Sequence, residues 1–386
     1  MTADSNLPLK DIRVVALEQA VAAPFCSRQL ADMGADVIKI ERPDGGDFAR
    51  AYDGALNGLS AYFAWLNRGK RSITLDLKKA KDHLALAKLV ERADVFIHNL
   101  TPDAVESFGF AYESVAQTNP GLIWCGISGY GSDGPYRNKK AYDLMVQGES
   151  GVMNLTGGPD TPAKVGISIA DIAAGLYGYS SILAALLNRA RSARGERIDI
   201  SMLECLTEWV TPALYAYQGS GRIPKRAGMR HNMIVPYGVY ACADGVVNFA
   251  IQNDREWHRF SSVVLSMPTL INDERFVTNE VRVRHRVELE TIIEQYLRTL
   301  KRSEVLGRLE EAQIAHGEMN DVAAVIQHPQ LAARRRWVQV DSPNGTIPAL
   351  VPPHNLRNAP ARMMGVPALG EHSQEILAEL GLWRME

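Results

Sequence analysis

The sequence predicts an α/β protein with a mostly parallel sheet, joined to a smaller α+β domain. Short β-rich runs alternate with helix-like segments through the first half, which favours a parallel sheet with helices on both faces. A polar and basic loop, QGSGRIPKRAGMRHNM at 218–233, marks a change of pattern. The length of 386 residues is typical of two or three domains.

The elements follow in chain order from these patterns. The expected strands of the sheet are Arg13–Leu17, Asp36–Ile40, Ser72–Leu75, Asp94–His98, Leu122–Ile127 and the segment ERIDISM at 196–202. Helical periodicity is found at Pro24–Met33, Lys79–Ala93, Ile172 to about Arg191, and Leu203–Tyr217. Later segments predict a hairpin at Tyr237–Ala250, helices at Asp254–Leu265, Glu280–Thr299 and Ser303–Glu311, strands at Trp337–Val340 and Thr346–Val351, and a last helix in PALGEHSQEILAELGL.

These patterns place the domain boundaries. We expect a large Rossmann-like domain at 1–221, a small α+β domain at 222–325, and a C-terminal segment at 326–386. No GxGxxG follows the first strand, where the sequence is EQAVAAP, so the standard dinucleotide fingerprint is absent.

The composition argues against several classes of function. The 42 basic and 44 acidic residues give a net charge of −2, which argues against a general attraction to nucleic acid or anionic membrane. The four cysteines form no CxxC or CxxH pair, so we expect no metal site. The N-terminal segment lacks the pattern of a signal peptide, which predicts a cytoplasmic protein.

Asp171 is the only charged residue in VGISIADIAAGLYGYSSILAALL, at 165–187. Its glycines, tyrosines and central carboxylate favour a buried core helix over a membrane span. On the residues alone, Asp171 is best explained as the N-cap of that helix. The second interpretation is a nucleophile that the helix N-terminus keeps ionised, with Gly166 and Gly175 giving a substrate room to approach. Asp143 is expected to cap the helix that follows it.

Several motifs, in this order, carry a resemblance to a known family. They are VVALEQAVAAPFCSRQLADMGADVIKIERPDGGDFAR at 14–50, NRGKRSITLDLK at 67–78, ADVFIHNLTPDAVESFGF at 93–110, CGISGYGSDGPYRNKKAYDLMVQGESG at 125–151, GISIADIAAG, GERIDISMLE and PALGEHSQEIL. The chain resembles the family III CoA-transferases, which include formyl-CoA transferase and the carnitine CoA-transferases. The resemblance implies that Asp171 attacks an acyl-CoA carbonyl and then carries CoA as an aspartyl thioester. It implies coenzyme A as the carried group, in an acyl-CoA substrate, and no metal.

Tyr142 separates two activities within the resemblance. The related α-methylacyl-CoA racemases carry histidine at this position, and proton removal beside a thioester needs such a base. A tyrosine, with an ordinary pKa near 10, is a poor base, so Tyr142 favours CoA transfer. In transferases this tyrosine lies near the acyl group, which makes Tyr142 a candidate substrate-binding residue. A racemase-like isomerase that uses Asp171 with another base stays an alternative, as does a non-catalytic CoA-binding protein.

The resemblance also supplies a CoA site. Residues at the family's nucleotide and pantetheine positions are Gln19, Val21, Arg42, Leu75, Lys78, Asn99, Leu100 and Lys140. The basic members suit the phosphates of CoA. Gln19 and Val21 stand where formyl-CoA transferase has histidine and glutamine, Leu100 replaces a phenylalanine, and Ser107 replaces an arginine. No GGGGQ-type loop is found, which argues against formyl-CoA:oxalate transfer.

The acid substrates are predicted from basic residues and from the resemblance. Arg226, Arg230 and His231, with Arg50, are candidates to hold the distal carboxylate of a dicarboxylic acid. The closest resemblance is to the branch that uses succinyl-CoA with dicarboxylates such as itaconate or mesaconate, and itaconate is the first expected acceptor; a different acid pair stays open. The resemblance further implies an interlocked homodimer, with the C-terminal segment returning to the large domain.

Overall fold

The computed structural model describes residues 6–382, which form two compact units. Unit 1 takes the described residues of Met1–Val152, Val165–Pro212 and Gln330–Glu386, and unit 2 takes Met153–Lys164 and Ala213–Pro329. The C-terminal part of the chain thus belongs to the same unit as the N-terminal part. The boundaries that the sequence suggested at 221/222 and 325/326 stay a prediction.

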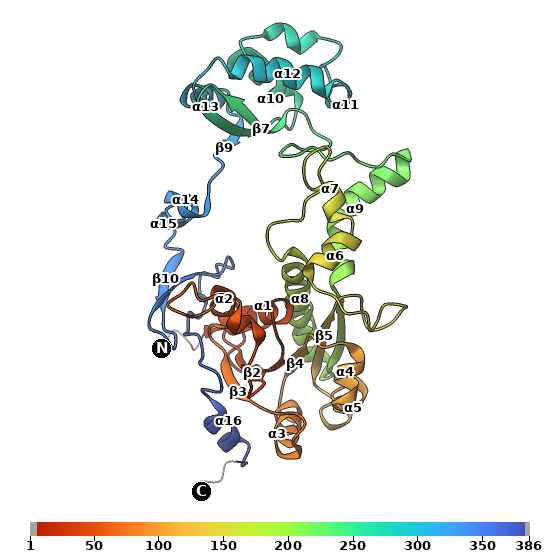
Figure 1. Cartoon of the computed structure of the whole chain (residues 1–386), viewed down its shortest axis with the longest axis vertical. Helices are drawn as coiled ribbons and strands as arrows, with labels where there is room; N and C mark the ends of the chain where they lie inside the picture. Colours follow the sequence, from red (N-terminus) through yellow and green to blue (C-terminus); the bar gives the residue numbers. More distant parts are fainter. Residues whose placement is uncertain (1–5, 383–386) are drawn as a thin grey trace. The chain divides into compact units, whose positions relative to one another are not determined.

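Unit 1 is built on one parallel sheet of six strands, in the order β3-β2-β1-β4-β5-β6 (Figure 1). The strands are β1 Arg13–Leu17, β2 Asp36–Glu41, β3 Arg71–Thr74, β4 Val95–His98, β5 Ile123–Ser128 and β6 Glu196–Ser201. This confirms the predicted α/β class and all six expected strands. The strand order reverses between β1 and β4, and ligands of such sheets bind at the carboxyl ends beside the reversal.

Helices cover both faces of this sheet. The helices of residues 22–220 are α1 Ala22–Asp32, η2 Phe48–Ala51, α2 Ala61–Asn67, α3 Ala80–Glu91, α4 Pro102–Ser107, α5 Tyr112–Thr118, α6 Asp143–Glu149, α7 Val152–Leu155, α8 Ile169–Ser192 and α9 Met202–Ser220. The boundary between the two units falls inside α7 and α9. The predicted helix start at Ile172 is wrong by three residues, since α8 begins at Ile169. This shift changes the position of Asp171, as described below.

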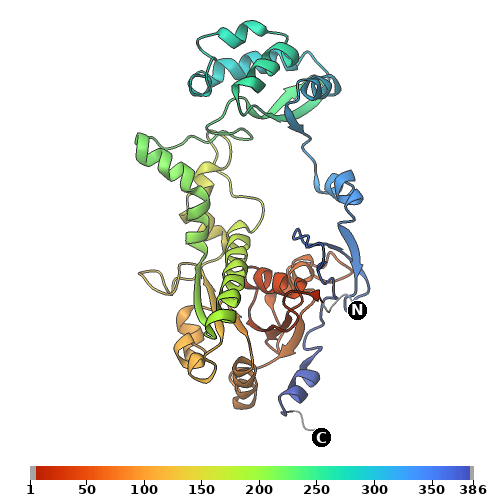
Figure 2. The same cartoon turned by 180° about the vertical axis from the view of Figure 1, so that it is seen from behind.

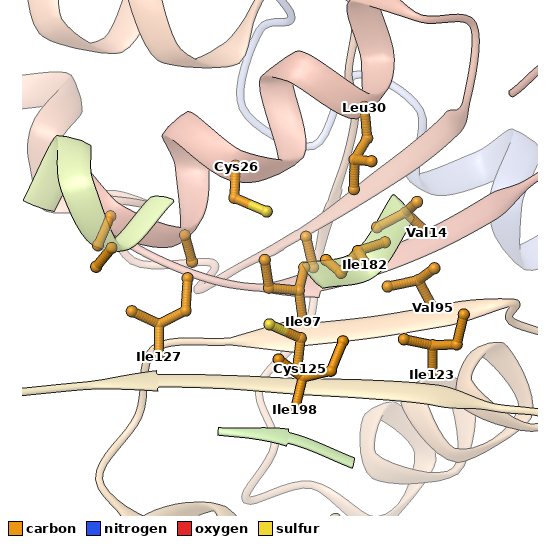
Figure 3. Close-up of a cluster of buried hydrophobic side chains, with 14 of the residues drawn as sticks. Val14, Cys26, Leu30, Val95, Ile97, Ile123, Cys125, Ile127, Ile182 and Ile198 are labelled. Carbon is orange, nitrogen blue, oxygen red and sulfur yellow. The ribbon is translucent and has the colours of Figure 1, made fainter. Parts of the chain in front are cut away.

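The core between the sheet and helices α1 and α8 is apolar and tightly packed (Figure 3). Cys26 and Leu30 of α1 and Ile182 of α8 lie over the side chains of the strands. The strand residues in this cluster include Val14, Val95, Ile97, Ile123, Cys125, Ile127 and Ile198. All four cysteines of the chain are buried and free. Burial of these side chains is the main force that holds α8 against the sheet.

Helices α1 and α8 lie side by side (Figures 1 and 2), and a glycine permits their close approach. A Cβ atom added to Gly175 would lie 2.5 Å from the Ala22 carbonyl oxygen, whereas Gly166 has open space around it. The role suggested for Gly175, to let a substrate approach, is therefore corrected: this glycine lets two helices pack. Its packing fixes the first turns of α1 and α8 relative to each other.

The opposite face of the sheet is covered by α3, α4 and α5 and by the last helix, α16 (Ser373–Glu379). Ile376 and Leu380 join the cluster that contains Phe96 and Trp124. The backbone N–H of His372 donates to the Ser72 carbonyl at 2.9 Å. The end of the described chain is thus integrated into unit 1.

Unit 2 has its own core around a three-stranded sheet, β7 (Tyr237–Cys242), β8 (Gly245–Ala250) and β9 (Ala315–Gly317). The hairpin predicted at Tyr237–Ala250 is confirmed. The helices that follow are α10 Asp254–Arg259, the π-helical η3 Phe260–Val264, η4 Pro268–Asn272, α11 Asn279–Arg284, α12 Arg286–Leu297, α13 Arg302–Glu311, α14 Val322–Ile326 and α15 Pro329–Ala333. The helix expected at 280–299 is broken at His285, which leaves helical geometry with φ −100° and ψ 26°.

After these helices, β10 (Trp337–Val340) and β11 (Ile347–Leu350) form the expected antiparallel pair around the turn SPNG. Among the described helices, Ile169–Ser192 alone has the length and mean hydropathy (1.4) of a membrane span. Core helices of soluble proteins share these features, and α8 buries Ala173, Ala174 and Ile182 in unit 1.

Candidate active site

A pocket of about 410 Å³ opens at the carboxyl ends of β1, β2, β3 and β4. It lies beside the reversal of strand order, where this class of sheet binds ligands. Five residues of the predicted CoA site line it: Gln19, Arg42, Leu75, Lys78 and Leu100. Its wall also contains Asp47, Leu77 and Phe108, which the sequence-based prediction did not include.

Two cations of this pocket are available to an anionic ligand. The ammonium group of Lys78 makes no ion pair within residues 6–382, and its side chain is exposed. Arg42 donates only to the Gly46 carbonyl, at 3.1 Å from Nη2 and 3.4 Å from Nε. An ionised carboxylate partner is recorded for neither side chain in the described chain, so both can contribute donors to phosphate oxygens.

The Asn99 side chain hydrogen-bonds to the backbone of Gln19 and does not line the pocket. Its Oδ1 accepts the Gln19 N–H at 3.0 Å and its Nδ2 donates to the Gln19 carbonyl at 2.7 Å. This pair of bonds joins the end of β4 to the end of β1, across the reversal of strand order. Val21 is buried as the N-cap residue of α1, and it too lies outside the pocket lining. A direct contact of Asn99 or Val21 with CoA stays a prediction.

Asp171 is the third residue of α8, not its N-cap. The cap position is Ser168, whose side chain makes no capping bond. Within the described chain the Asp171 carboxylate accepts no hydrogen bond, and its own backbone N–H has no recorded acceptor. Asp171 is thus a partly buried carboxylate in the first turn of a helix, with its oxygens unoccupied.

Asp143 supplies the cap that was expected of Asp171. Its Oδ1 accepts the N–H of Ala170, in the first turn of α8, at 2.7 Å, and its Oδ2 accepts from Gln147 at 2.7 Å. The prediction that Asp143 caps its own helix, α6, is therefore wrong. Neither backbone position nor spacing indicated this, because residues 143 and 170 meet only in the folded chain.

The two carboxylates together set the charge state of Asp171. Burial raises the pKa of Asp171 to about 7, and the nearby charge of Asp143 contributes to the shift. Desolvation and the second negative charge thus act against the expected effect of the helix N-terminus, which was to keep Asp171 ionised. A carboxylate with a pKa near neutrality is more basic, and so more nucleophilic, than an ordinary aspartate.

Tyr142 and Lys140 precede α6, whose N-cap residue is Tyr142. The Tyr142 side chain is 53% exposed, and the Lys140 ammonium lies 5.5 Å from the centre of its ring. Lys140 is absent from the lining of the 410 Å³ pocket. Tyr142 is next to Asp143 in sequence, which places it close to the carboxylate that caps α8.

Tyr52 is a neighbour of Asp171 that the sequence-based prediction missed. Partial burial, then the charges of Asp47 and Asp171, raise the pKa of the Tyr52 phenol to about 12. The phenol therefore stays a hydrogen-bond donor at neutral pH. Its ring belongs to a row of contacting aromatic side chains that runs Phe48, Tyr52, Tyr62, Trp65 and Phe25. The high density of aromatic residues at 48–65 is the feature of the sequence that could have indicated this neighbour.

Arg50 is engaged within the fold. Its Nε and Nη2 donate to the two carboxylate oxygens of Glu41 at 2.8 and 2.7 Å, and its guanidinium stacks 3.7 Å from the centre of the Phe63 ring. Further bonds reach the Pro367 carbonyl. Arg50 thereby ties the C-terminal segment to β2, and a role for it in holding a substrate carboxylate stays a prediction.

The basic residues predicted to bind the distal carboxylate lie in unit 2. Arg226 donates to the carbonyl oxygens of Gly158 and Pro159, both at 2.9 Å. Arg230 is ion-paired with Glu290 and Glu294. These bonds occupy both guanidinium groups.

His231, the third of these residues, is exposed and stacks on Tyr237 at 5.1 Å between ring centres. Substrate binding by Arg226, Arg230 and His231 stays a prediction. No cluster of three or more potential metal ligands is present among the described residues.

Comparisons with known proteins identify the family of this chain. A family profile described as CoA-transferase family III matches residues 9–373. The chain is 39% identical to the succinate–glutarate CoA-transferase of Agrobacterium fabrum over 384 residues, covering 97% of this chain and 96% of that protein. It is 33% identical to the succinyl-CoA:mesaconate CoA-transferase of Haloarcula hispanica, with 97% and 96% covered.

Among solved structures, the fold is similar to a CAIB/BAIF family protein from Brucella suis. The TM-score is 0.84 at 37% sequence identity, with 97% of this chain and all of that chain covered. The family profile and the two relatives each span nearly the whole length of the sequence. The resemblance stated from the motifs is confirmed: this chain belongs to CoA-transferase family III and is a CoA-transferase enzyme.

Proposed function

We propose that this protein transfers CoA from succinyl-CoA to a small dicarboxylic acid through an aspartyl-CoA thioester on Asp171. The observation that carries the proposal is the state of Asp171: a partly buried carboxylate, free of hydrogen bonds in the described chain, with a pKa raised to about 7. Family membership supports the reaction class.

Each step of the proposed reaction replaces one bond to an acyl carbon by another. Ionised Asp171 attacks the succinyl thioester carbonyl and expels CoA thiolate, which leaves an aspartyl–succinyl anhydride. The thiolate attacks the aspartyl carbonyl, releases succinate and forms the aspartyl-CoA thioester. The acceptor carboxylate attacks this thioester and expels thiolate, which then attacks the new acyl carbonyl and restores Asp171.

Two groups of unit 1 support the steps that develop negative charge. The backbone N–H of Asp171 is free in the described chain, and a free N–H in the first turn of a helix stabilises an oxyanion. The Tyr52 phenol, protonated at neutral pH, is a second available donor. The pocket at the ends of β1 to β4 supports the CoA part of the proposal, because Arg42 and Lys78 leave donors for phosphates.

The proposal names a donor acyl-CoA and a class of acceptor acid, and each has its own support. Succinyl-CoA as donor is supported by the names of relatives such as the mesaconate enzyme. For the acceptor we propose a C4–C5 dicarboxylate, with itaconate first from the sequence resemblance and glutarate beside it from the name of the Agrobacterium relative. The unit 2 arginines contribute no support, because their donors are occupied.

We further propose that the protein acts in the cytoplasm as a homodimer of the interlocked type that the resemblance implies. Exposed apolar side chains on α9 support burial by a second copy: Trp209, Leu214, Tyr215 and Tyr217. Sedimentation analysis of the purified protein tests this part, since a monomer at micromolar concentration would contradict it.

The main test is a mass-spectrometric screen of succinyl-CoA against a panel of acids that includes itaconate, mesaconate, glutarate and oxalate. The expected result is a new acyl-CoA with a dicarboxylate and none with oxalate. Trapping with hydroxylamine during turnover should modify Asp171, and Asp171→Asn should show neither product nor trapping. If no acid exchanges CoA, or if deuterium enters next to the thioester without exchange, the transferase proposal is wrong.

A further inference from the structure

We propose that Asp47 is the positioning residue of the CoA site, a buried carboxylate that holds the β1–α1 turn and the helix leading to Tyr52 in one fixed arrangement. The inference rests on the proposed function for its role in catalysis. It rests on contacts within unit 1 for its geometry. Asp47 lines the 410 Å³ pocket, and its side chain is fully buried.

Asp47 bonds to three separate parts of the chain. Its Oδ1 accepts the backbone N–H of Ala20 at 3.0 Å and that of Ala49 at 2.9 Å. Its Oδ2 accepts from the Lys39 ammonium at 2.9 Å. One carboxylate thus connects the turn after β1, the start of η2, and strand β2.

The turn after β1 needs this anchor because its backbone is strained. Ala20 has φ +63°, a left-handed conformation that is strained for a residue with a Cβ atom. Its N–H is held by Asp47, and the backbone of Gln19, next to it, is held by Asn99. Gln19 lines the pocket and Val21 begins α1, so the strained turn places both the pocket wall and the helix start.

Asp47 belongs to a network of buried ion pairs. Lys39 is fully buried and lies 2.9 Å from Asp47 and 3.4 Å from Glu18. Glu18 in turn pairs with buried Lys70 at 2.6 Å. Two carboxylates thus face two ammonium groups, so the network is neutral, and removing one charge leaves its partner uncompensated.

Asp47 also reaches the neighbourhood of Asp171. It caps η2, a short 3-10 helix that ends at Ala51 and is followed by Tyr52. Because the Tyr52 phenol feels the charges of both Asp47 and Asp171, it lies near both carboxylates. The same side chain that holds the pocket wall therefore holds the residue beside the nucleophile.

The variant Asp47→Asn tests the inference because the new amide has an unfavourable contact in each of its two orientations. With its oxygen toward Ala20 and Ala49, its NH₂ group faces the Lys39 ammonium, donor against donor. When flipped, the NH₂ group faces two backbone N–H groups instead. The double variant Lys39→Met/Asp47→Asn removes the ammonium, so the amide oxygen can accept from Ala20 and Ala49 while the NH₂ group faces an apolar side chain and no second donor. The remaining pair of Glu18 and Lys70 stays neutral.

Asp32 provides the matched control. It is a buried carboxylate of the same unit, ion-paired with Arg28 and Arg68 at the other end of α1. Asp32→Asn disturbs a buried ion cluster as Asp47→Asn does, but its bonds do not reach the pocket or Tyr52. It separates loss of stability from loss of positioning.

The experiment measures binding of free coenzyme A by titration calorimetry, with kcat for succinyl-CoA as the second readout. We expect Asp47→Asn to weaken CoA binding about tenfold and to lower kcat several-fold. The double variant should regain CoA affinity to within about threefold of wild type. Asp32→Asn should unfold at a lower temperature while its CoA affinity stays within about twofold of wild type.

Three results would overturn the inference: unchanged CoA affinity in Asp47→Asn, no recovery in the double variant, or equal weakening in Asp32→Asn. If Asp47→Asn does not fold, comparison of the double variant with Asp32→Asn still tests the inference. The double variant should bind CoA only if the bonds accepted by Oδ1 of residue 47 position the site. The proposed function fails separately, when no acid pair exchanges CoA although free CoA binds as expected.

Discussion

Asp143 and Asp171 share one helix end with different tasks. Asp143 caps the first turn of α8 from outside, through a 2.7 Å bond from Ala170, and its charge contributes to the raised pKa of Asp171. The helix N-terminus therefore stabilises Asp143 through a hydrogen bond, while Asp171 is left with free oxygens. The carboxylate proposed as the nucleophile is therefore a different one from the carboxylate that caps the helix.

The first prediction concerns pH. The proposed mechanism requires ionised Asp171, and the pKa of this carboxyl is about 7. We therefore expect kcat/KM for succinyl-CoA to rise with pH through about 7 and to level off above it. In Asp143→Asn the amide oxygen can still accept from Ala170, whereas the NH₂ group faces the Gln147 NH₂ that Asp143 now accepts from, and the negative charge is gone. The midpoint of the profile should then move to lower pH, while burial keeps it above the ordinary aspartate value.

Measurement of kcat/KM between pH 5 and 9 checks both statements. The control is Asp143→Ala, which removes the charge and also the cap, and should lower the free energy of unfolding by about 1 kcal/mol. A profile with the same midpoint in wild type and Asp143→Asn would show that Asp143 does not act on Asp171.

The second prediction is that Asp171→Asn is more stable than wild type at alkaline pH. The pKa of Asp171 is raised in the folded state, from an ordinary value of 3.8 to about 7, so ionisation favours the unfolded chain. Stability that is present at pH 4 is lost as the pH rises toward 7. The variant escapes this loss and should gain about 4 kcal/mol in the free energy of unfolding at pH 8, and less than half of that at pH 5.

Urea unfolding at the two pH values measures this difference. The variant should also be inactive, which is the common exchange of stability for function at an active site. Equal stability of wild type and Asp171→Asn at pH 8 would show that Asp171 is not desolvated in the folded protein.

The strands, part of the pocket and the candidate nucleophile could be predicted from local patterns in the sequence. The six strands were readable because buried parallel strands such as FIH and IWCGIS are short apolar runs between helical segments. Arg42 and Lys78 were found through motifs, and they line one pocket as expected. The nucleophile candidate stood out because a lone carboxylate in an apolar helix is costly.

The features that were missed depend on pairs of residues distant in sequence. Asp143 caps a helix that starts 26 residues later, and Asn99 holds a turn 80 residues before it. Arg50 looked free in the sequence, but Glu41 and the Pro367 carbonyl take its donors. Local spacing carries no trace of such partners, since a polar side chain is satisfied by whichever group the fold brings to it.

The third prediction tests the packing of α1 on α8. Gly175→Ala would bring a methyl group to 2.5 Å from the Ala22 carbonyl oxygen, so the helices must move apart. We expect a loss of about 1–3 kcal/mol in stability and reduced kcat, because the first turn of α8 carries Asp171. Gly166→Ala is the matched control, since nothing lies within 4 Å of its added Cβ atom. Equal unfolding temperatures for the two variants would contradict the packing role of Gly175.

The last prediction concerns His98, which lies at the end of β4 and is 2% exposed. Its Nδ1 accepts the Leu100 N–H at 3.2 Å, while burial lowers the pKa of His98 to about 3. The ring is therefore neutral with its proton on Nε2, which has no partner among the described residues. Leu100 lines the 410 Å³ pocket proposed to bind CoA, so this bond shapes the pocket wall.

Two isosteric replacements separate the ring nitrogens. His98→Asn places an amide oxygen near the position of Nδ1 and should keep the Leu100 bond, so CoA affinity should stay within about threefold of wild type. His98→Gln places its amide near Nε2, loses the Leu100 bond, and should weaken CoA binding by about tenfold. Nitrogen NMR shifts of wild type should show protonated Nε2 from pH 5 to 8. A protonated Nδ1, or a Gln variant that binds CoA better than the Asn variant, would contradict the assigned tautomer and its link to the pocket.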